Sequence, residues 1–172
     1  MANTYTLIAS STVGSGGASN IEFTSIPATY TDLNILLSAR TNEAQIYGSM
    51  KLQFNNSTTT YSSKELYGSG SAAASVSRGV LDSGLYIGDV NGNSSTANSF
   101  SNFSIYIPNY TSSDYKSVSS DGVQENNATE AYLRILAGLW STGNAITSIK
   151  FSYTGSTILQ YSTAYLYGIT NS

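Results

Sequence analysis

The stretch "DLNILLSAR", residues 32–40, decides the fold class. Its side chains alternate between Leu33, Ile35, Leu37 and Ala39 on one face and Asn34, Leu36, Ser38 and Arg40 on the other. This period of two is that of a β-strand with one buried face, and only Leu36 interrupts the polar face. Upstream, Pro27 ends the preceding segment because proline cannot donate to a β-ladder. Asp32 is then expected to accept a local backbone hydrogen bond in the turn.

Working outward, similar strand signals recur at short intervals along the chain. We expect strands in the ranges 4–10 (with Tyr5, Leu7 and Ala9 on one face), 21–23, 50–54, 61–67, 85–90, 103–107, 145–153 and 162–169. Residues 13–20 should form a flexible connection, and residues 68–77 either a mobile loop or a flat edge. Asn91-Gly92 predicts a hairpin, Asp121-Gly122 a further turn, and Pro108 the end of a strand.

The segment 129–140, "TEAYLRILAGLW", allows two interpretations. Leu133, Leu136, Ala137 and Trp140 fit a helical stripe. A strand is favoured because Gly138 weakens a helix and the surrounding segments are all β. As a strand it has two faces: Leu133, Ile135, Ala137 and Leu139 against Tyr132, Arg134, Leu136 and Trp140.

These signals predict an all-β protein of about 8–10 strands with no βαβ rhythm. The expected architecture is an antiparallel β-sandwich, jelly-roll-like, formed by a single domain over residues 1–172. A chain of 172 residues is long enough to bury a sizeable core.

The low content of charged residues limits the kinds of partner that the protein is expected to bind. Only 10% of the residues are charged and the net charge is −3, so neither nucleic acid nor an anionic membrane is an expected partner. Low charge gives weak electrostatic protection against association, which fits a protein held in an assembly. We see no signal peptide and no membrane span in the sequence, so the protein should be made and folded in a cytoplasm.

Catalysis is not predicted. The chain contains no His and no Cys, which rules out Ser–His–Asp and Cys–His nucleophilic sites and makes a zinc site atypical. Glycosidase chemistry needs only two carboxylates, but the aspartates mostly stand beside turn residues: Asp32, Asp82, Asp89, Asp114 and Asp121. "DVNGN" (89–93) has its glycine at the wrong place for a calcium loop, and "GSGG" (14–17) lacks the GK[ST] of a phosphate loop. We therefore expect no enzyme, no cofactor and no metal site.

Aromatic residues crowd the C-terminal part of the chain: Tyr153, Tyr161, Tyr165 and Tyr167, with Trp140 upstream. Such rings can form a platform for sugar faces. They can also pack in the core or at a subunit contact, where tyrosine supplies apolar area and a polar tip. The second interpretation is favoured, and no particular binding residue is predicted.

Three stretches carry a family resemblance: "TLIASSTVGSGGASNIEFTSIPATYTDL" (6–33), "AITSIKF" (145–151) and "STAYLYGI" (162–169). Together they resemble a pattern found in small virion structural proteins of tailed bacteriophages. The order is an N-terminal "S-x-T-V-G-S-G-G-A" hairpin, then "F-T-S-I-P-x-T-Y-T-D-L", and a terminal "L-Y-G-I". The resemblance covers both ends of the chain but not its middle.

The resemblance implies a β-sandwich that serves as a capsid decoration (cement) protein or as a fibre or receptor-binding tip, usually as a homotrimer. It supplies no catalytic residues. Because the chain has no long adaptor, heptad run or collagen-like shaft, decoration is favoured. The expected partner is then the major capsid protein and the expected location the capsid surface of the virion. The alternative is a tail or head-fibre module that recognises a host surface glycan.

Overall fold

The computed structural model describes residues 4–81, 83–127 and 130–170, which form twelve β-strands and no helix. The strands are β1 (Tyr5–Thr12), β2 (Asn20–Phe23), β3 (Asp32–Ala39), β4 (Tyr47–Phe54), β5 (Tyr61–Gly68), β6 (Ala73–Leu81), β7 (Leu85–Asn91), β8 (Ser101–Ile107), β9 (Lys116–Gln124), β10 (Tyr132–Trp140), β11 (Ile149–Ser152) and β12 (Thr163–Ile169). The all-β prediction is confirmed, although the strands outnumber the eight to ten expected.

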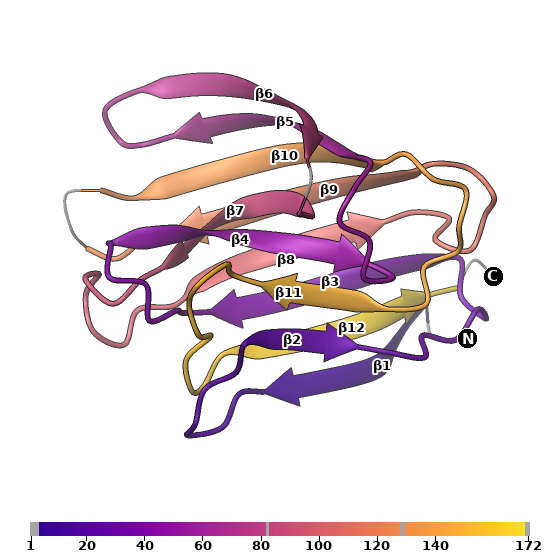
Figure 1. Cartoon of the computed structure of the whole chain (residues 1–172), viewed down its shortest axis with the longest axis horizontal. Helices are drawn as coiled ribbons and strands as arrows, with labels where there is room; N and C mark the ends of the chain where they lie inside the picture. The colour runs from indigo at the N-terminus through magenta and orange to yellow at the C-terminus, as the bar shows by residue number, and fades with distance from the viewer. Residues whose placement is uncertain (1–3, 82, 128–129, 171–172) are drawn as a thin grey trace.

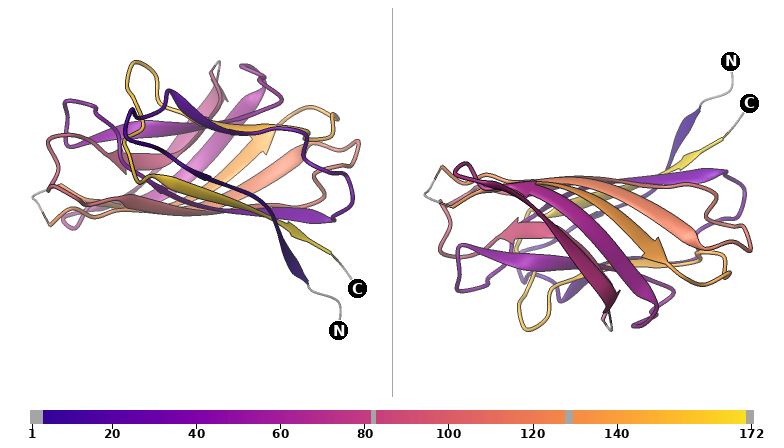
Figure 2. Two further views of the ribbon diagram at one scale, coloured as in Figure 1. Left: turned by 90° about the horizontal axis from the view of Figure 1, so that it is seen from below. Right: turned by 90° about the horizontal axis from the view of Figure 1, so that it is seen from above.

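The strands form two antiparallel sheets that pack face to face as a sandwich (Figures 1 and 2). The larger sheet has eight strands in the order β1-β12-β3-β8-β9-β10-β5-β6, and the smaller has four in the order β2-β11-β4-β7. This order is compatible with a jelly-roll-like arrangement, which stays a prediction. In Figure 1 the smaller sheet lies over the middle of the larger one, and β5 and β6 extend past its edge.

Strand β3 occupies the middle of the core, as its alternation predicts. Leu33 and Ile35 are fully buried and Leu37 is 1% exposed, whereas Leu36 on the opposite face is 44% exposed. Ile35 lies between Leu166 of β12 and Ile105 of β8. Burying one such aliphatic side chain contributes about 1.5–3 kcal/mol, so these rows are a major source of stability.

The segment 129–140 contains a strand, β10, and the helical alternative is wrong over its described residues. Its inward face carries Arg134, Leu136 and Trp140. The more uniformly aliphatic face points outward, with Leu133 56% and Ile135 58% exposed. This strand therefore buries an arginine and exposes two aliphatic residues.

The predicted hairpin at Asn91-Gly92 is wrong. Strand β7 belongs to the smaller sheet and β8 to the larger one, so the connection crosses between layers. Asn91 is the fully buried last residue of β7. A Cβ at Gly92 would collide with the Gln45 carbonyl oxygen, so a close backbone approach explains the glycine.

The predicted turn at Asp121-Gly122 is also wrong, because both residues lie inside β9. A Cβ at position 122 would lie 2.7 Å from Cδ1 of the Phe103 ring on the neighbouring strand. Gly122 therefore makes room for a core aromatic side chain rather than for a reversal of the chain.

Three expectations near the sheet edges need adjustment. A β-bulge between Leu7 and Ala9 breaks the predicted single face of β1, so Leu7 is exposed while Ala9 packs against the core. Residues 13–20, expected to be a flexible connection, are tied down by an antiparallel bridge between Ala18 and Ile158. Of the two alternatives for 68–77, the edge is right, since β6 is the last strand of the larger sheet.

Candidate functional site

The C-terminal aromatic residues do not form one platform. Trp140 is buried in the core, where it stacks on Tyr61 with ring centroids 6.2 Å apart. Tyr165 and Tyr167 lie on the outer side of β12, and Tyr161 lies in the turn before it. Tyr153 packs against the core beside β4.

The aspartates are equally dispersed. Asp32 accepts hydrogen bonds from the backbone N–H of Asn109 and from the Tyr106 hydroxyl, each at 2.8 Å, so the expectation of a local partner is wrong. Asp121 is exposed on a strand, Asp114 is exposed in a loop, and Asp82 lies outside the described residues. In the described part of the chain, no three acidic side chains gather as a metal ion would require.

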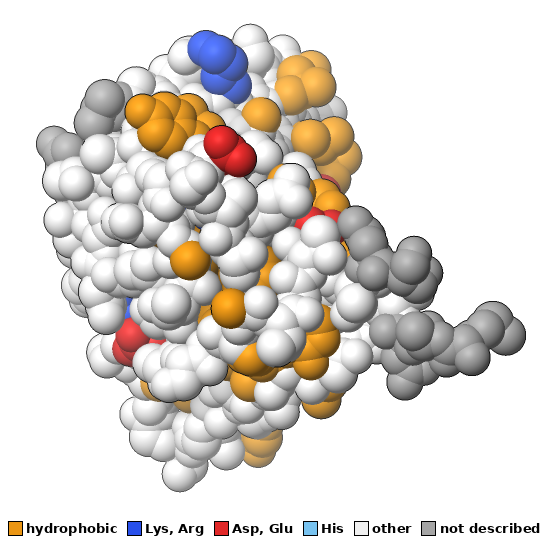
Figure 3. Space-filling view, turned by 90° about the vertical axis from the view of Figure 1, so that its right-hand side faces the viewer, with side chains coloured by type: hydrophobic (Ala, Val, Ile, Leu, Met, Phe, Trp, Pro, Cys, Tyr) orange, Lys and Arg blue, Asp and Glu red, His pale blue; other side chains and the backbone are white. Residues whose placement is uncertain are grey.

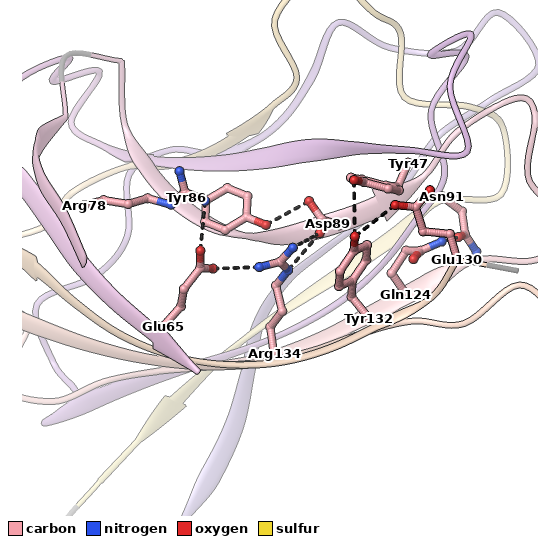
Figure 4. Close-up of polar contacts among 10 residues, drawn as sticks. All are labelled: Tyr47, Glu65, Arg78, Tyr86, Asp89, Asn91, Gln124, Glu130, Tyr132 and Arg134. Atoms are coloured by element: carbon pink, nitrogen blue, oxygen red, sulfur yellow. Dashed lines mark hydrogen bonds and ion pairs between the residues drawn. The ribbon is translucent and has the colours of Figure 1, made fainter. Parts of the chain in front are cut away.

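Asp89 belongs to a group that we call the interior charge cluster, which comprises Glu65, Arg78, Tyr86, Asp89 and Arg134 (Figure 4). The Arg134 guanidinium donates from Nε to Asp89 Oδ2 at 2.8 Å and from Nη1 to Glu65 Oε2 at 3.1 Å. Arg78 Nη2 donates to Glu65 Oε1 at 2.8 Å. The Tyr86 hydroxyl donates to Asp89 Oδ1 at 2.8 Å.

The cluster joins the two layers of the sandwich. Glu65, Arg78 and Arg134 come from β5, β6 and β10 of the larger sheet, whereas Tyr86 and Asp89 come from β7 of the smaller one. The two guanidinium groups balance the two carboxylates, which is the condition under which charges can be buried. The cluster therefore links the sheets where β5 and β10 meet β7.

Aromatic rings enclose the central cation. The Arg134 guanidinium carbon lies 4.7 Å from the ring centroid of Tyr67, 4.6 Å from that of Tyr132 and 5.6 Å from that of Tyr86. Each ring face attracts a cation through its quadrupole. The rings thus hold the guanidinium in place from the sides that the carboxylates leave open.

Burial shifts the pKa values of Asp89 and Tyr86 in this cluster. Desolvation raises the pKa of Asp89, against the opposing pull of the Arg134 charge. Desolvation, together with the nearby Asp89 charge, raises the pKa of the Tyr86 phenol, so it stays a hydrogen-bond donor at neutral pH. Both carboxylates accept from the Arg134 guanidinium, and Glu65 also accepts from the partly exposed Arg78, so the arrangement cross-links the two layers.

The same strands carry the candidate interaction site on their opposite side. Leu66 of β5 and Leu133 and Ile135 of β10 are 55%, 56% and 58% exposed. Ile135 pairs directly with Leu66 across the two strands. We call these three residues the outer apolar patch. In Figure 3 hydrophobic side chains gather along the upper right margin of the molecule.

More large exposed side chains lie on the other half of the same sheet face: Tyr5, Leu7, Leu36, Tyr106 and Tyr165. Between the two halves, Ser104 and Asp121 occupy paired positions on β8 and β9. Adjacent exposed side chains of this size are uncommon on a protein that works alone, and they typically mark an interaction surface.

The outer apolar patch was not predicted from the sequence. On apolarity alone, the face of Leu133, Ile135, Ala137 and Leu139 would be buried, because the opposite face includes Arg134. The available signal was that both faces of β10 are largely apolar. Here one apolar face is buried in the core and the other is exposed.

In the described part of the chain, no helix has the length and hydrophobicity needed to cross a membrane. Comparisons with protein-family models, with curated proteins and with solved structures found no match for the chain.

Proposed function

We propose that the protein is a virion structural protein of a tailed bacteriophage, namely a capsid decoration (cement) protein that binds the major capsid protein and stabilises the shell. The main structural support is the outer apolar patch, which offers a surface on the larger sheet for contact with the capsid protein. The sequence resemblance supplies the virion context. No catalytic role is part of this proposal.

The chemistry of the face suits broad protein contact. Leu66, Leu133 and Ile135 offer apolar area, and on β9 Val123 lies opposite Leu133 and Asp121 opposite Ile135. The exposed charges among these rows are Lys64 and Asp121. An interface core that is apolar and poor in charge is typical of stable association, and its strength should depend little on salt.

Binding to the assembled shell would stabilise it by mass action, because the protein would bind the shell and not the dissociated subunits. We expect a homotrimer, since closed symmetry lets one small domain contact several capsid subunits at once. Sedimentation equilibrium of the purified protein tests the trimer separately from shell binding.

The decisive measurement is copy number in purified virions, by quantitative mass spectrometry against the major capsid protein. Many copies in a fixed ratio to that protein are expected for a decoration protein. A handful per particle would overturn the proposal in favour of the alternative, a tail or head-fibre module that recognises a host surface glycan.

A pair of variants tests the attachment face. Ile135→Asp places a charge in the outer apolar patch and should abolish binding to shells that lack the protein, because a buried unpaired carboxylate is costly. Tyr115→Asp is the matched control: Tyr115 is 64% exposed, but it lies in the loop between β8 and β9. The control should bind normally, and equal binding by both variants would exclude this face.

A further inference from the structure

A hollow of about 440 Å³ opens at one end of the sandwich. Its lining comes from four segments: residues 15–17 after β1, residues 40–42 after β3, residues 98–100 before β8 and residues 157–161 before β12. These connections lie at the end opposite the two chain termini (Figure 1). None of the three residues of the outer apolar patch lines the hollow.

Tyr161 at this hollow has an unusual backbone conformation, which the Tyr161 N–H helps to hold by donating to the Val13 carbonyl at 3.0 Å. Its φ is 71°, in the left-handed region that favours glycine. It is the third residue of a turn closed by the Ser162 N–H donating to the Leu159 carbonyl at 3.2 Å. Glycine or asparagine is usual at the third position of a turn that requires positive φ.

The Tyr161 side chain is also 68% exposed, so burial of the ring does not compensate the backbone strain. Residues held in sparsely populated backbone regions cluster at active sites and ligand clamps. Phe100, on the opposite connection, lines the same hollow and is half-buried. The hollow thus combines an exposed phenol ring with a second aromatic side chain.

The polar lining is neutral apart from one cation. Amide and hydroxyl groups come from Asn42, Asn98, Gln160 and Ser15. Arg40 also lines the hollow, and none of the other lining residues has a carboxylate. Arg40 Nη1 donates to the carbonyls of Thr96 and Ser99 at 2.8 Å each, and Nη2 donates to the Ser95 carbonyl at 3.1 Å. Arg40 is only 7% exposed, and carbonyl oxygens hold its guanidinium in place without neutralising it.

We propose that this hollow binds a saccharide that carries a carboxylate. Aromatic rings can pack on the apolar face of a sugar ring, and amide and hydroxyl groups can bond its hydroxyls. The fixed, uncompensated Arg40 guanidinium favours a carboxylate, because charge-assisted hydrogen bonds to Arg are the strong ones. This site is independent of the proposed attachment to a capsid, so either proposal can fail without the other.

The first experiment compares matched ligands by saturation-transfer NMR with the full chain. Methyl glucuronide and methyl glucoside differ only in the carboxylate, and an array of acidic and neutral oligosaccharides extends the comparison to other sugar rings. Acidic members should bind more than about tenfold more tightly than their neutral counterparts. Equal binding of both series, or no binding of any acidic member, would overturn the proposal.

The second experiment uses Tyr161→Gly, which removes the ring and suits the turn. Binding of the acidic saccharide should fall by more than about tenfold while the thermal midpoint stays the same or rises. Tyr115→Ala removes another exposed tyrosine, away from the hollow, and should leave binding unchanged. A Tyr161→Gly protein that binds as tightly as the wild type would show that the hollow is not the site.

Discussion

Strands β3 and β10 belong to the same sheet but distribute their side chains in opposite ways. Strand β3 turns Leu33, Ile35 and Leu37 inward. Strand β10 turns Arg134 inward, where the interior charge cluster holds it, and turns Leu133 and Ile135 outward. The half of the sheet around β3 therefore buries its apolar residues. The half around β10 buries a charged residue and exposes some of its apolar ones.

The two halves of the sheet obtain their stability from different sources. Around β3 the source is removal of aliphatic surface from water. Around β10 stability also depends on the interior charge cluster. Every member of that cluster must keep its partner, because an unpaired buried charge costs far more free energy than a lost apolar contact. The half around β10 also leaves aliphatic residues exposed, and these are the residues that we assign to an interface.

The largest effect is expected at the centre of the half around β10. Arg134→Met leaves the Asp89 carboxylate buried without a cation and Glu65 with Arg78 alone. The free energy of unfolding should fall by about 3–5 kcal/mol, measured by urea denaturation at neutral pH. Lys150→Met is the control, since Lys150 donates to an exposed Asn56 side chain and its loss should cost less than about 0.5 kcal/mol. Equal stability of the two variants would mean that the cluster does not hold the layers together.

A matched pair of isoleucines tests the comparison directly. Ile35 is 0% exposed and Ile135 is 58% exposed. Ile35→Ala should lower the free energy of unfolding by about 2–5 kcal/mol, because it leaves a cavity in the core. Ile135→Ala should change it by less than about 0.5 kcal/mol. Thermal and urea unfolding measure both, and a large loss for Ile135→Ala would place that side chain in the fold rather than at an interface.

Tyr61 gives the core a pH dependence at high pH. Desolvation raises the pKa of Tyr61 to about 12 from its ordinary value of 10.0. The neutral phenol is thus favoured in the folded state, so its contribution is complete below pH 10 and is lost as the pH rises towards 12. The thermal midpoint should fall across this window, as measured by calorimetry at stepwise pH.

Tyr61→Phe isolates this contribution. The Phe54 backbone N–H donates to the Tyr61 hydroxyl at 2.8 Å, and loss of that acceptor should cost about 1–3 kcal/mol at neutral pH. The variant should then lose less stability than the wild type above pH 10. Parallel curves for the two proteins would assign the alkaline loss to other tyrosines.

The smallest effect is a gain. Tyr161→Gly removes a side chain from a residue with φ 71°, which should raise the free energy of unfolding by about 0.5–1 kcal/mol. Chemical denaturation of the purified variant measures this. A loss of stability instead would show that the exposed ring supports the turn.

The fold class and much of the strand content could be predicted from the amino-acid sequence. Alternation over 33–39 located β3 and its buried face, and the segments 50–54, 103–107 and 162–169 contain most or all of β4, β8 and β12. These predictions succeed because a period of two depends on each strand alone. The predicted strand at 145–153 is confirmed only over Ile149–Ser152.

The roles of Gly92, Gly122 and Arg134 could not be predicted, because they depend on contacts with distant segments of the chain. The glycines at 92 and 122 read as turn signals, but both positions are set by close approach of a distant segment. Likewise, nothing local showed that Arg134 points inward, because its compensating partners Glu65 and Asp89 lie far away in the chain. Burial of a charge depends on which groups surround it in space. For the same reason the outer apolar patch and the hollow at Tyr161 became visible only after the strands were assembled.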